Sequence, residues 1–177
     1  MGLKQIRIQG DNILTKRAKP VKEITPDILT LLDDMKETME KTDGVGIAAP
    51  QVGMLKRIAV IAHEDEFYEL INPEILEASG SQICNEACLS VNGLCGDVDR
   101  PTTLKVRATN RNGEAFIVEA TDFMASVFSH ELDHLDGILF VDKATNLKPI
   151  DDEEREDRRH ARRRRSRQRR TGELSAQ

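Results

Sequence analysis

Two histidines and the glutamate beside the first of them are the residues of this sequence best suited to chemistry. His130 and His134 lie four residues apart, so on an α-helix both imidazoles project from the same face. Two imidazoles at this spacing can bind one metal ion. Glu131 points partly away from that face, which leaves its carboxylate free to take a proton from a metal-bound water. The pattern indicates a metal-dependent hydrolytic site, against the alternative of two histidines spaced this way by chance.

The residues around this pattern favour a helix. Thr121 or Asp122 can cap its N-terminus, because a short side-chain oxygen accepts from the unpaired N–H groups of the first turn. Gly137 can end the helix, since glycine adopts the left-handed conformation at little cost. Apolar residues recur between them at near-helical spacing, at Phe123, Met124, Val127, Phe128, Leu132 and Leu135. An apolar helix that carries two histidines and a glutamate inward needs polar partners for them, and a metal ion would supply those partners.

A metal held by two histidines in a catalytic site needs a third protein ligand, with a fourth position left open. Cys84, Cys88 and Cys95 are candidates, as are many carboxylates, and the spacing alone does not choose among them. For any one of these cysteines, a buried thiol that packs as a small hydrophobic side chain is the commoner fate. The third ligand therefore stays open at the level of the residue pattern.

A run of small residues over 44–51 is the second stretch of interest. Its glycines and alanines would let the backbone approach a bound molecule closely. The run matches neither of the common glycine patterns that bind phosphates, so we expect a tight loop of another kind. Gln51, at its end, carries a neutral amide that could donate to an oxyanion, although a surface glutamine is the more common outcome.

The composition is that of a single domain of 177 residues with a mostly aliphatic core, since aromatic residues make up only 3%. Residues 1–10 lack the apolar segment of a signal peptide, and no hydrophobic run approaches the length that spans a membrane. Three cysteines, an odd number, do not indicate a disulfide framework. These observations predict a cytoplasmic protein without a membrane partner, in which a functional cysteine is a ligand or a nucleophile.

Further along the chain, the predicted strands and helices are segregated rather than alternating. Thr25 and Pro26 open a helix with one apolar face, which ends near Asp43-Gly44. Strand-like runs follow at 57–62, 67–71, 98–100, 104–108, 115–120 and 138–141. We expect Asn72-Pro73 to end the second of these runs, and Asn112-Gly113 to join two of them in a hairpin. Segregated elements of this kind predict an α+β fold.

The charge distribution divides the chain into a body, residues 1–149, and a C-terminal tail, residues 150–177. The net charge is −5, but residues 155–170 hold ten Arg against two acidic residues, a local charge of +8. This segment has no apolar face, so we expect it to be disordered or a solvated helix. One interpretation is that the tail contacts RNA phosphates, with an affinity that falls steeply with salt. The alternative is a solvated charged tail with internal ion pairs.

Three stretches together resemble the three signature motifs of the peptide deformylase family. They are Gly44-Val45-Gly46-Ile47-Ala48-Ala49-Pro50-Gln51, Glu86-Ala87-Cys88-Leu89-Ser90 and His130-Glu131-Leu132-Asp133-His134, in the family's order and with similar separations. The similarity extends from about residue 6 to about residue 145, and the combination is far more specific than any one motif. The resemblance implies an α+β fold of mixed, mainly antiparallel β-sheets packed around a central helix that carries the metal motif.

The resemblance also implies a role for each residue of the catalytic site. Three residues would bind one divalent metal ion: Cys88, His130 and His134. Fe²⁺ is the usual metal of the family, and Ni²⁺, Co²⁺ or, less well, Zn²⁺ can substitute. Glu131 would be the catalytic acid and base, while Gln51 and the backbone N–H of Leu89 would stabilise the oxyanion.

The substrate implied by the resemblance is the N-formylmethionyl end of a nascent peptide, from which the enzyme removes the formyl group as formate. The peptide would lie against the backbone of Gly46, and Glu86 and Arg100 would form a supporting ion pair beside the cysteine ligand. We further predict that an apolar pocket for the methionine side chain is lined by Val45, Phe123 and Val127.

The sequence departs from the family pattern at three positions. Ala87 replaces a glycine, Ser129 a glutamine and Asn92 a proline. A methyl group at position 87 would be strained if the backbone there had a positive φ or approached the substrate closely.

Two other functions stay open. One is a peptidase that cleaves internal bonds, although such enzymes usually use a third His or Glu ligand. The other is a catalytically weak metal protein that associates with the ribosome or RNA through its tail.

Overall fold

The computed structural model describes residues 2–151, so that nearly all of the predicted tail lies outside the described residues. The two α-helices of this range are α1 (Pro26–Lys41) and α2 (Asp122–Leu135). Short 3₁₀ helices occur at η1 (Asn12–Thr15), η2 (Ala49–Val52) and η3 (Phe140–Asp142). The strands are β1 (Gly46–Ala48), β2 (Ile58–His63), β3 (Glu66–Ser79), β4 (Gln82–Cys88), β5 (Val91–Arg100), β6 (Thr103–Thr109), β7 (Ala115–Thr121) and β8 (Thr145–Pro149). None of the described helices has the length and apolar character needed to cross a membrane.

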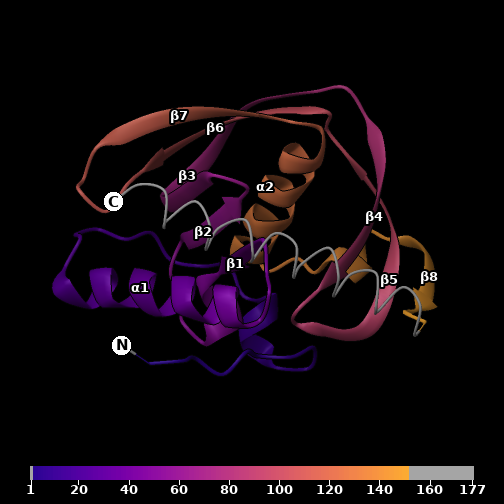
Figure 1. Cartoon of the computed structure of the whole chain (residues 1–177), viewed down its shortest axis with the longest axis horizontal. Coiled ribbons are helices and arrows are strands. Elements are labelled where there is room, and N and C mark those ends of the chain that lie inside the picture. The colour runs from indigo at the N-terminus through magenta and orange to yellow at the C-terminus, as the bar shows by residue number, and fades with distance from the viewer. Residues whose placement is uncertain (1, 152–177) are drawn as a thin grey trace.

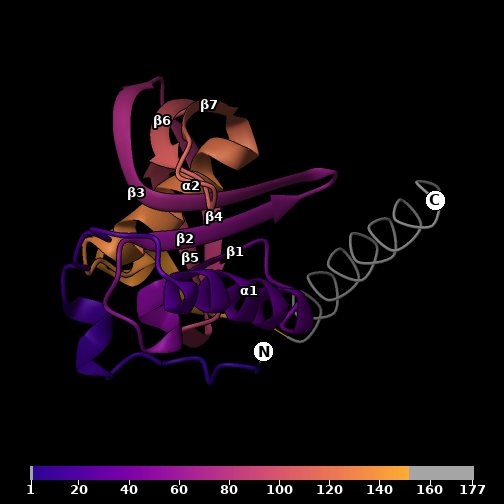
Figure 2. The ribbon, with the colours of Figure 1, turned by 90° about the vertical axis from the view of Figure 1, so that its left-hand side faces the viewer.

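The strands form two antiparallel sheets, and α2 contacts both of them (Figures 1 and 2). The larger sheet has the strand order β1-β2-β3-β6-β7, and the smaller sheet has the order β4-β5-β8. In the larger sheet, Thr103 of β6 pairs with Thr121 of β7, which confirms the hairpin predicted from Asn112-Gly113. The arrangement confirms the predicted α+β fold, with antiparallel sheets around a central helix that carries the histidines.

Helix α2 is held in place by its apolar face. Phe128 is fully buried and packs edge-on against Tyr68, with ring centroids 5.4 Å apart. Leu132 and Leu135 join the same core cluster. Gly137 follows the helix with a φ of 75°, and a Cβ there would lie 2.7 Å from the backbone of Thr15, so only glycine fits. Because this apolar face is fixed in the core, the opposite face of α2, which carries His130 and His134, keeps a fixed orientation relative to the sheets.

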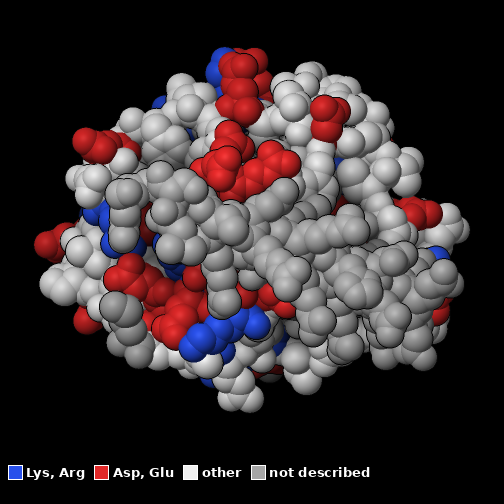
Figure 3. Space-filling model, viewed as in Figure 1, with Lys and Arg blue, Asp and Glu red and all other residues white. Residues whose placement is uncertain are grey.

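Helix α1 confirms the pattern predicted for it. It begins at Pro26 after the N-cap Thr25, and it buries an apolar face made of Ile28, Leu31, Leu32, Met35 and Met39. These side chains pack against Ile58 and Val60 of β2 in a second core cluster. Acidic side chains gather over α1 on the outer surface (Figure 3). The helix leads directly into the glycine-containing loop, so its packing determines where that loop lies.

One predicted boundary and one predicted strand are wrong. Strand β3 continues through Asn72-Pro73, because Asn72 takes a positive φ of 52° and the pairing with β6 shifts register there. The irregularity bends the strand without ending it. The apolar run at 138–141 forms no strand, and residues 140–142 form η3 instead. The run is apolar because Leu139 and Phe140 are buried in a third core cluster, and not because it forms a strand.

Candidate active site

Three potential metal ligands converge from β4 and α2. The Sγ of Cys88 lies 3.2 Å from Nε2 of His134, which in turn lies 3.2 Å from Nε2 of His130. The ligand atoms of the three residues all lie within 4.8 Å of one another. A thiolate and two imidazoles form a donor set that suits a divalent transition metal, and three protein ligands are the number that a catalytic site uses. Of the three cysteines, it is therefore Cys88 that the structure places beside the two histidines.

The surroundings of Cys88 favour its ionised form. Burial opposes ionisation, but the adjacent rings of His134 and His130 outweigh it and hold the pKa of the thiol well below its usual value. The backbone N–H of Ser90 and the amide of Gln51 also lie within 3.4 and 3.5 Å of the sulfur. The thiolate is the form of cysteine that binds metals.

Glu131 lies beside these three potential ligands. Its side chain is buried, and Oε2 has no hydrogen-bond partner among the described residues. Burial raises the pKa of this carboxyl to about 7, despite the opposing effect of His130 and His134. Gly46 makes room for the carboxylate, since a Cβ at that position would lie only 2.5 Å from Oε1 of Glu131. A group with a pKa near neutrality can both accept and release a proton at physiological pH.

The predicted ion pair between Glu86 and Arg100 is present and buried. Nε of Arg100 donates to Oε1 of Glu86 at 2.7 Å, and Nη2 donates to Oε2 at 3.0 Å. The same Oε2 lies 2.8 Å from Nδ1 of His130. Glu86 thereby connects Arg100 to His130, and the contact at Nδ1 leaves Nε2 of His130 directed towards Cys88 and His134.

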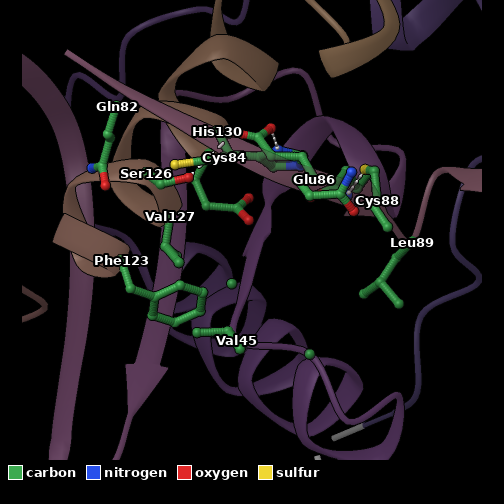
Figure 4. A pocket seen from close by; sticks show the side chains of 16 residues that line it. Val45, Gln82, Cys84, Glu86, Cys88, Leu89, Phe123, Ser126, Val127 and His130 are labelled. Carbon is green, nitrogen blue, oxygen red and sulfur yellow. Dashed lines mark hydrogen bonds and ion pairs between the residues drawn. The ribbon is translucent and has the colours of Figure 1, made fainter. Parts of the chain in front are cut away.

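A cavity of about 450 Å³ opens in front of these residues (Figure 4). Its walls include both predicted oxyanion residues, Gln51 and Leu89, and Glu131. The amide oxygen of Gln51 accepts from the N–H of Ala48 at 2.7 Å, which orients the NH₂ group towards Cys88. All four residues predicted to contact substrate also line it: Val45, Gly46, Phe123 and Val127. The structure therefore brings every predicted site residue to one cavity or to its immediate support.

The sequence profile described as "Polypeptide deformylase" matches residues 3–149 of the chain. The chain belongs to the polypeptide deformylase family. The peptide deformylase of Acetivibrio thermocellus is 52% identical over 159 residues, which are 90% of this chain and 92% of that relative. The crystal structure of the peptide deformylase from Thermotoga maritima has a TM-score of 0.80 at 38% identity, over 82% of this chain and 99% of the other. A class I type b peptide deformylase from Acinetobacter baumannii, with Met-Ala-Ser bound, has a TM-score of 0.77 at 35% identity, over 80% and 98% of the two chains.

The three departures from the deformylase pattern fit the backbone of this chain. Ala87 lies in β4 and is not among the residues with positive φ, so its methyl group causes no backbone strain. Ser129 is buried and donates to the carbonyl of Ala125 one turn earlier in α2, which satisfies its hydroxyl. Asn92 is exposed in β5. Ala87 does line the cavity, so an effect of its methyl group on substrate contact stays a prediction.

Several residues of the site were missed by the sequence reasoning. Ser126 donates to Oε1 of Glu86 at 3.2 Å, and Ser90 accepts from Nε2 of Gln51 at 3.2 Å. Asp133 and Lys143 continue the ion-pair network beyond Arg100. Ser90 and Asp133 fall within the deformylase motifs, which was the available signal. Nothing in the sequence around Lys143 indicates that it pairs with the motif helix.

The buried Glu86 predicts a specific pH dependence of stability in the metal-free protein. Burial raises its pKa, but His130 and Arg100 outweigh burial and lower the pKa to about 2. The unfolded chain therefore binds a proton at higher pH than the folded one, and stability is lost as the pH falls from about 4.5 towards 2. From pH 6 to pH 3, the free energy of unfolding should fall by about 2 kcal/mol more in wild type than in the Glu86→Gln variant.

Urea unfolding of chelator-treated protein at these two pH values measures this difference. Glu74→Gln is the matched control, because Glu74 also pairs with an arginine, Arg107, but on the exposed face. The control should keep the wild-type pH dependence. Equal pH dependence in Glu86→Gln and wild type would contradict the prediction.

Proposed function

We propose that this chain is a metal-dependent hydrolase that removes the N-formyl group from the initiator methionine of newly made proteins and releases formate. The observation that carries the proposal is the cluster of Cys88, His130 and His134 with the carboxylate of Glu131 beside it, whose Oε2 has no partner among the described residues, at one cavity of a deformylase-family chain. Each of these residues matches a position that the family motifs assign to the metal or to proton transfer.

Cys88, His130 and His134 are the residues that would hold the metal. The unpaired Oε2 of Glu131 supports this assignment, because a buried carboxylate without a protein partner is costly unless a cation or a bound water faces it. A divalent cation in this position would lower the pKa of a water molecule and polarise the formyl oxygen.

The remaining steps are assigned to side chains and backbone of this chain. Glu131 accepts the proton of the attacking water, for which its pKa near 7 is well matched, and then delivers it to the leaving amine. The attack places negative charge on the formyl oxygen. The amide NH₂ of Gln51 and the N–H of Leu89 are proposed to donate to that oxygen. The hydrogen bond from Ala48 orients Gln51 before substrate arrives, so little reorganisation is needed.

The substrate side chain is proposed to enter the part of the cavity near Phe123 and Val127, which lie on the first half of α2. Val45, on the loop before β1, lies across from them in Figure 4. These three side chains offer the apolar walls that a methionine side chain needs. The related structure with Met-Ala-Ser bound supports a peptide of this kind as the occupant.

The direct test is formate release from formyl-Met-Ala-Ser by anaerobically purified protein loaded with iron or nickel. We expect formate release from this substrate. We expect no hydrolysis of an N-acetylated peptide, which has no formyl group and could be cleaved only at its internal peptide bonds. Cleavage of the internal bonds would favour the peptidase alternative. A folded, metal-loaded protein that releases no formate would contradict the proposal and favour the catalytically weak, RNA-associated alternative.

We further propose that the metal is Fe²⁺, with Ni²⁺, Co²⁺ or Zn²⁺ able to substitute. A thiolate ligand on iron(II) makes the site sensitive to oxygen, because the iron(II) reacts with oxygen and the sulfur bound to it is then oxidised. Iron-loaded protein should lose most of its formate release after exposure to air, whereas nickel-loaded protein should keep it. Equal activity of the iron form before and after exposure would contradict the assignment of iron.

The C-terminal tail is proposed to contact the ribosome in the cytoplasm, where nascent chains emerge. Residues 155–170 carry a local charge of +8, whereas the body up to residue 150 carries −8. The tail is thus the part of the chain suited to RNA phosphates. Truncation after residue 150 should weaken co-sedimentation with ribosomes by about tenfold at low salt and should reduce its salt dependence. Formate release from the free tripeptide serves as the control and should stay unchanged.

A further inference from the structure

Asp133 belongs to the metal motif but has no part in the mechanism above. It lies on α2 between Glu131 and His134, and it is not among the residues that line the cavity. Its Oδ2 accepts from Nη1 of Arg100 at 2.6 Å. Both of its oxygens also accept from Nζ of Lys143, at 2.7 and 2.8 Å. The carboxylate is therefore placed between two cations.

This carboxylate is the outer part of a continuous series of contacts that ends at a metal ligand. Arg100, at the end of β5, contacts Asp133 on one side and Glu86 on the other. Glu86, on β4, contacts Nδ1 of His130 on α2. The series thus ties together the strand that carries Cys88 and the helix that carries both histidines. Its members have exposed side-chain fractions of 3% at Arg100, 7% at Glu86 and 15% at Asp133, rising to 42% at Lys143.

Each member of the series constrains the next. The guanidinium of Arg100 is planar and rigid, so two carboxylates at different edges determine its position more closely than Glu86 alone. Both oxygens of Glu86 are occupied, one by Ser126 and Arg100 and the other by Arg100 and His130. A shift of Arg100 would therefore move the carboxylate that orients the His130 ring. A buried guanidinium that loses one of two partners has reason to shift, because its charge is then poorly compensated.

We propose that Asp133 is a positioning residue for the metal site, acting through Arg100 and Glu86 on the orientation of His130, with Lys143 completing its charge balance. This inference rests on the proposed ligand set. It predicts that the charge of Asp133, and not only its shape, affects how tightly the metal is held. Contacts of this outer kind around metal ligands typically change metal affinity by 10- to 100-fold.

The test compares Asp133→Asn with a matched control on the same helix end, Asp136→Asn. Asp136 is the C-cap of α2 and pairs with Arg57 at 2.7 Å and Arg17 at 3.3 Å. Within the described part of the chain, neither arginine is paired with one of the three proposed metal ligands. Each protein is loaded with Co²⁺. The visible absorption bands of the thiolate–cobalt site are recorded, and the rate of cobalt loss to excess chelator is measured. Thermal melting of each variant shows how much stability it has lost.

We expect Asp133→Asn to shift the cobalt bands and to lose cobalt at least tenfold faster than wild type. Asp136→Asn should match wild type in both readouts, even where it melts at lower temperature. Lys143→Met, at the more exposed end, should show a smaller effect in the same direction, and it provides the measurement if Asp133→Asn does not fold. If both Asp133→Asn and Lys143→Met keep the wild-type bands and release rates, the positioning role of Asp133 is overturned, while the proposed ligand set stands. A wild-type protein without thiolate–cobalt bands would overturn the proposed ligand set as well.

Discussion

Replacing Glu131 by glutamine is expected to reduce formate release from formyl-Met-Ala-Ser by about a thousandfold. Glutamine keeps the shape of the side chain but cannot accept the proton of the attacking water or pass it to the amine. Metal content should stay at the wild-type level, because the proposed ligands are Cys88, His130 and His134. The measurement is formate production under saturating substrate, together with metal analysis of the same sample.

Thermal stability provides a second readout for this variant. The carboxylate of Glu131 is buried, its Oε2 has no partner within residues 2–151, and burial raises its pKa to about 7. A neutral amide removes the cost of holding that charge, so metal-free Glu131→Gln should melt at or above the wild-type temperature at pH 8. A lower melting temperature would mean that the carboxylate contributes to stability. Retained turnover would remove Glu131 from the mechanism.

The substitution Gly46→Ala is expected to lower kcat/KM for the same substrate by about a hundredfold. A Cβ at Gly46 would lie 2.5 Å from Oε1 of Glu131 and 2.8 Å from its Cδ and Cγ. These distances are too short for the carboxylate to stay where it is, so the carboxylate of Glu131 must move. The backbone itself tolerates alanine, because Gly46 does not have a positive φ.

Gly44→Ala is the matched control for this loop. A Cβ at Gly44 would lie 3.3 Å from Cδ1 of Leu89 and 3.3 Å from Cγ of Met39, and these side chains need to move by only a few tenths of an ångström. Its effect on kcat/KM should stay below about tenfold. In the Glu131→Gln background, Gly46→Ala should cost little more, because the two changes act on the same group. Full additivity of the two losses would show that Gly46 acts on the substrate directly and not through Glu131.

The residue pattern predicted the chemistry proposed for the site and the type of most helices and strands. The spacing of His130 and His134 places both rings on one helical face wherever that helix lies, because the helical period is a local property of the chain. The same holds for the apolar face of α1 and for the hairpin between β6 and β7. The family motifs then distinguished Cys88 from the other cysteines, which periodicity could not do.

Which distant groups meet depends on how the helices and strands pack. Gly46 faces Glu131, 85 positions later, because α2 packs against β1 and β2 in a common core. The pairing of Asp133 with Arg100 and Lys143 depends on the placement of β5 and of the segment after η3. The strand through Asn72-Pro73 continues because the neighbouring β6 pairs with it across the irregularity. Local patterns encode faces and periods, but partners across a fold are selected by how those faces pack, so only the packed structure reveals them.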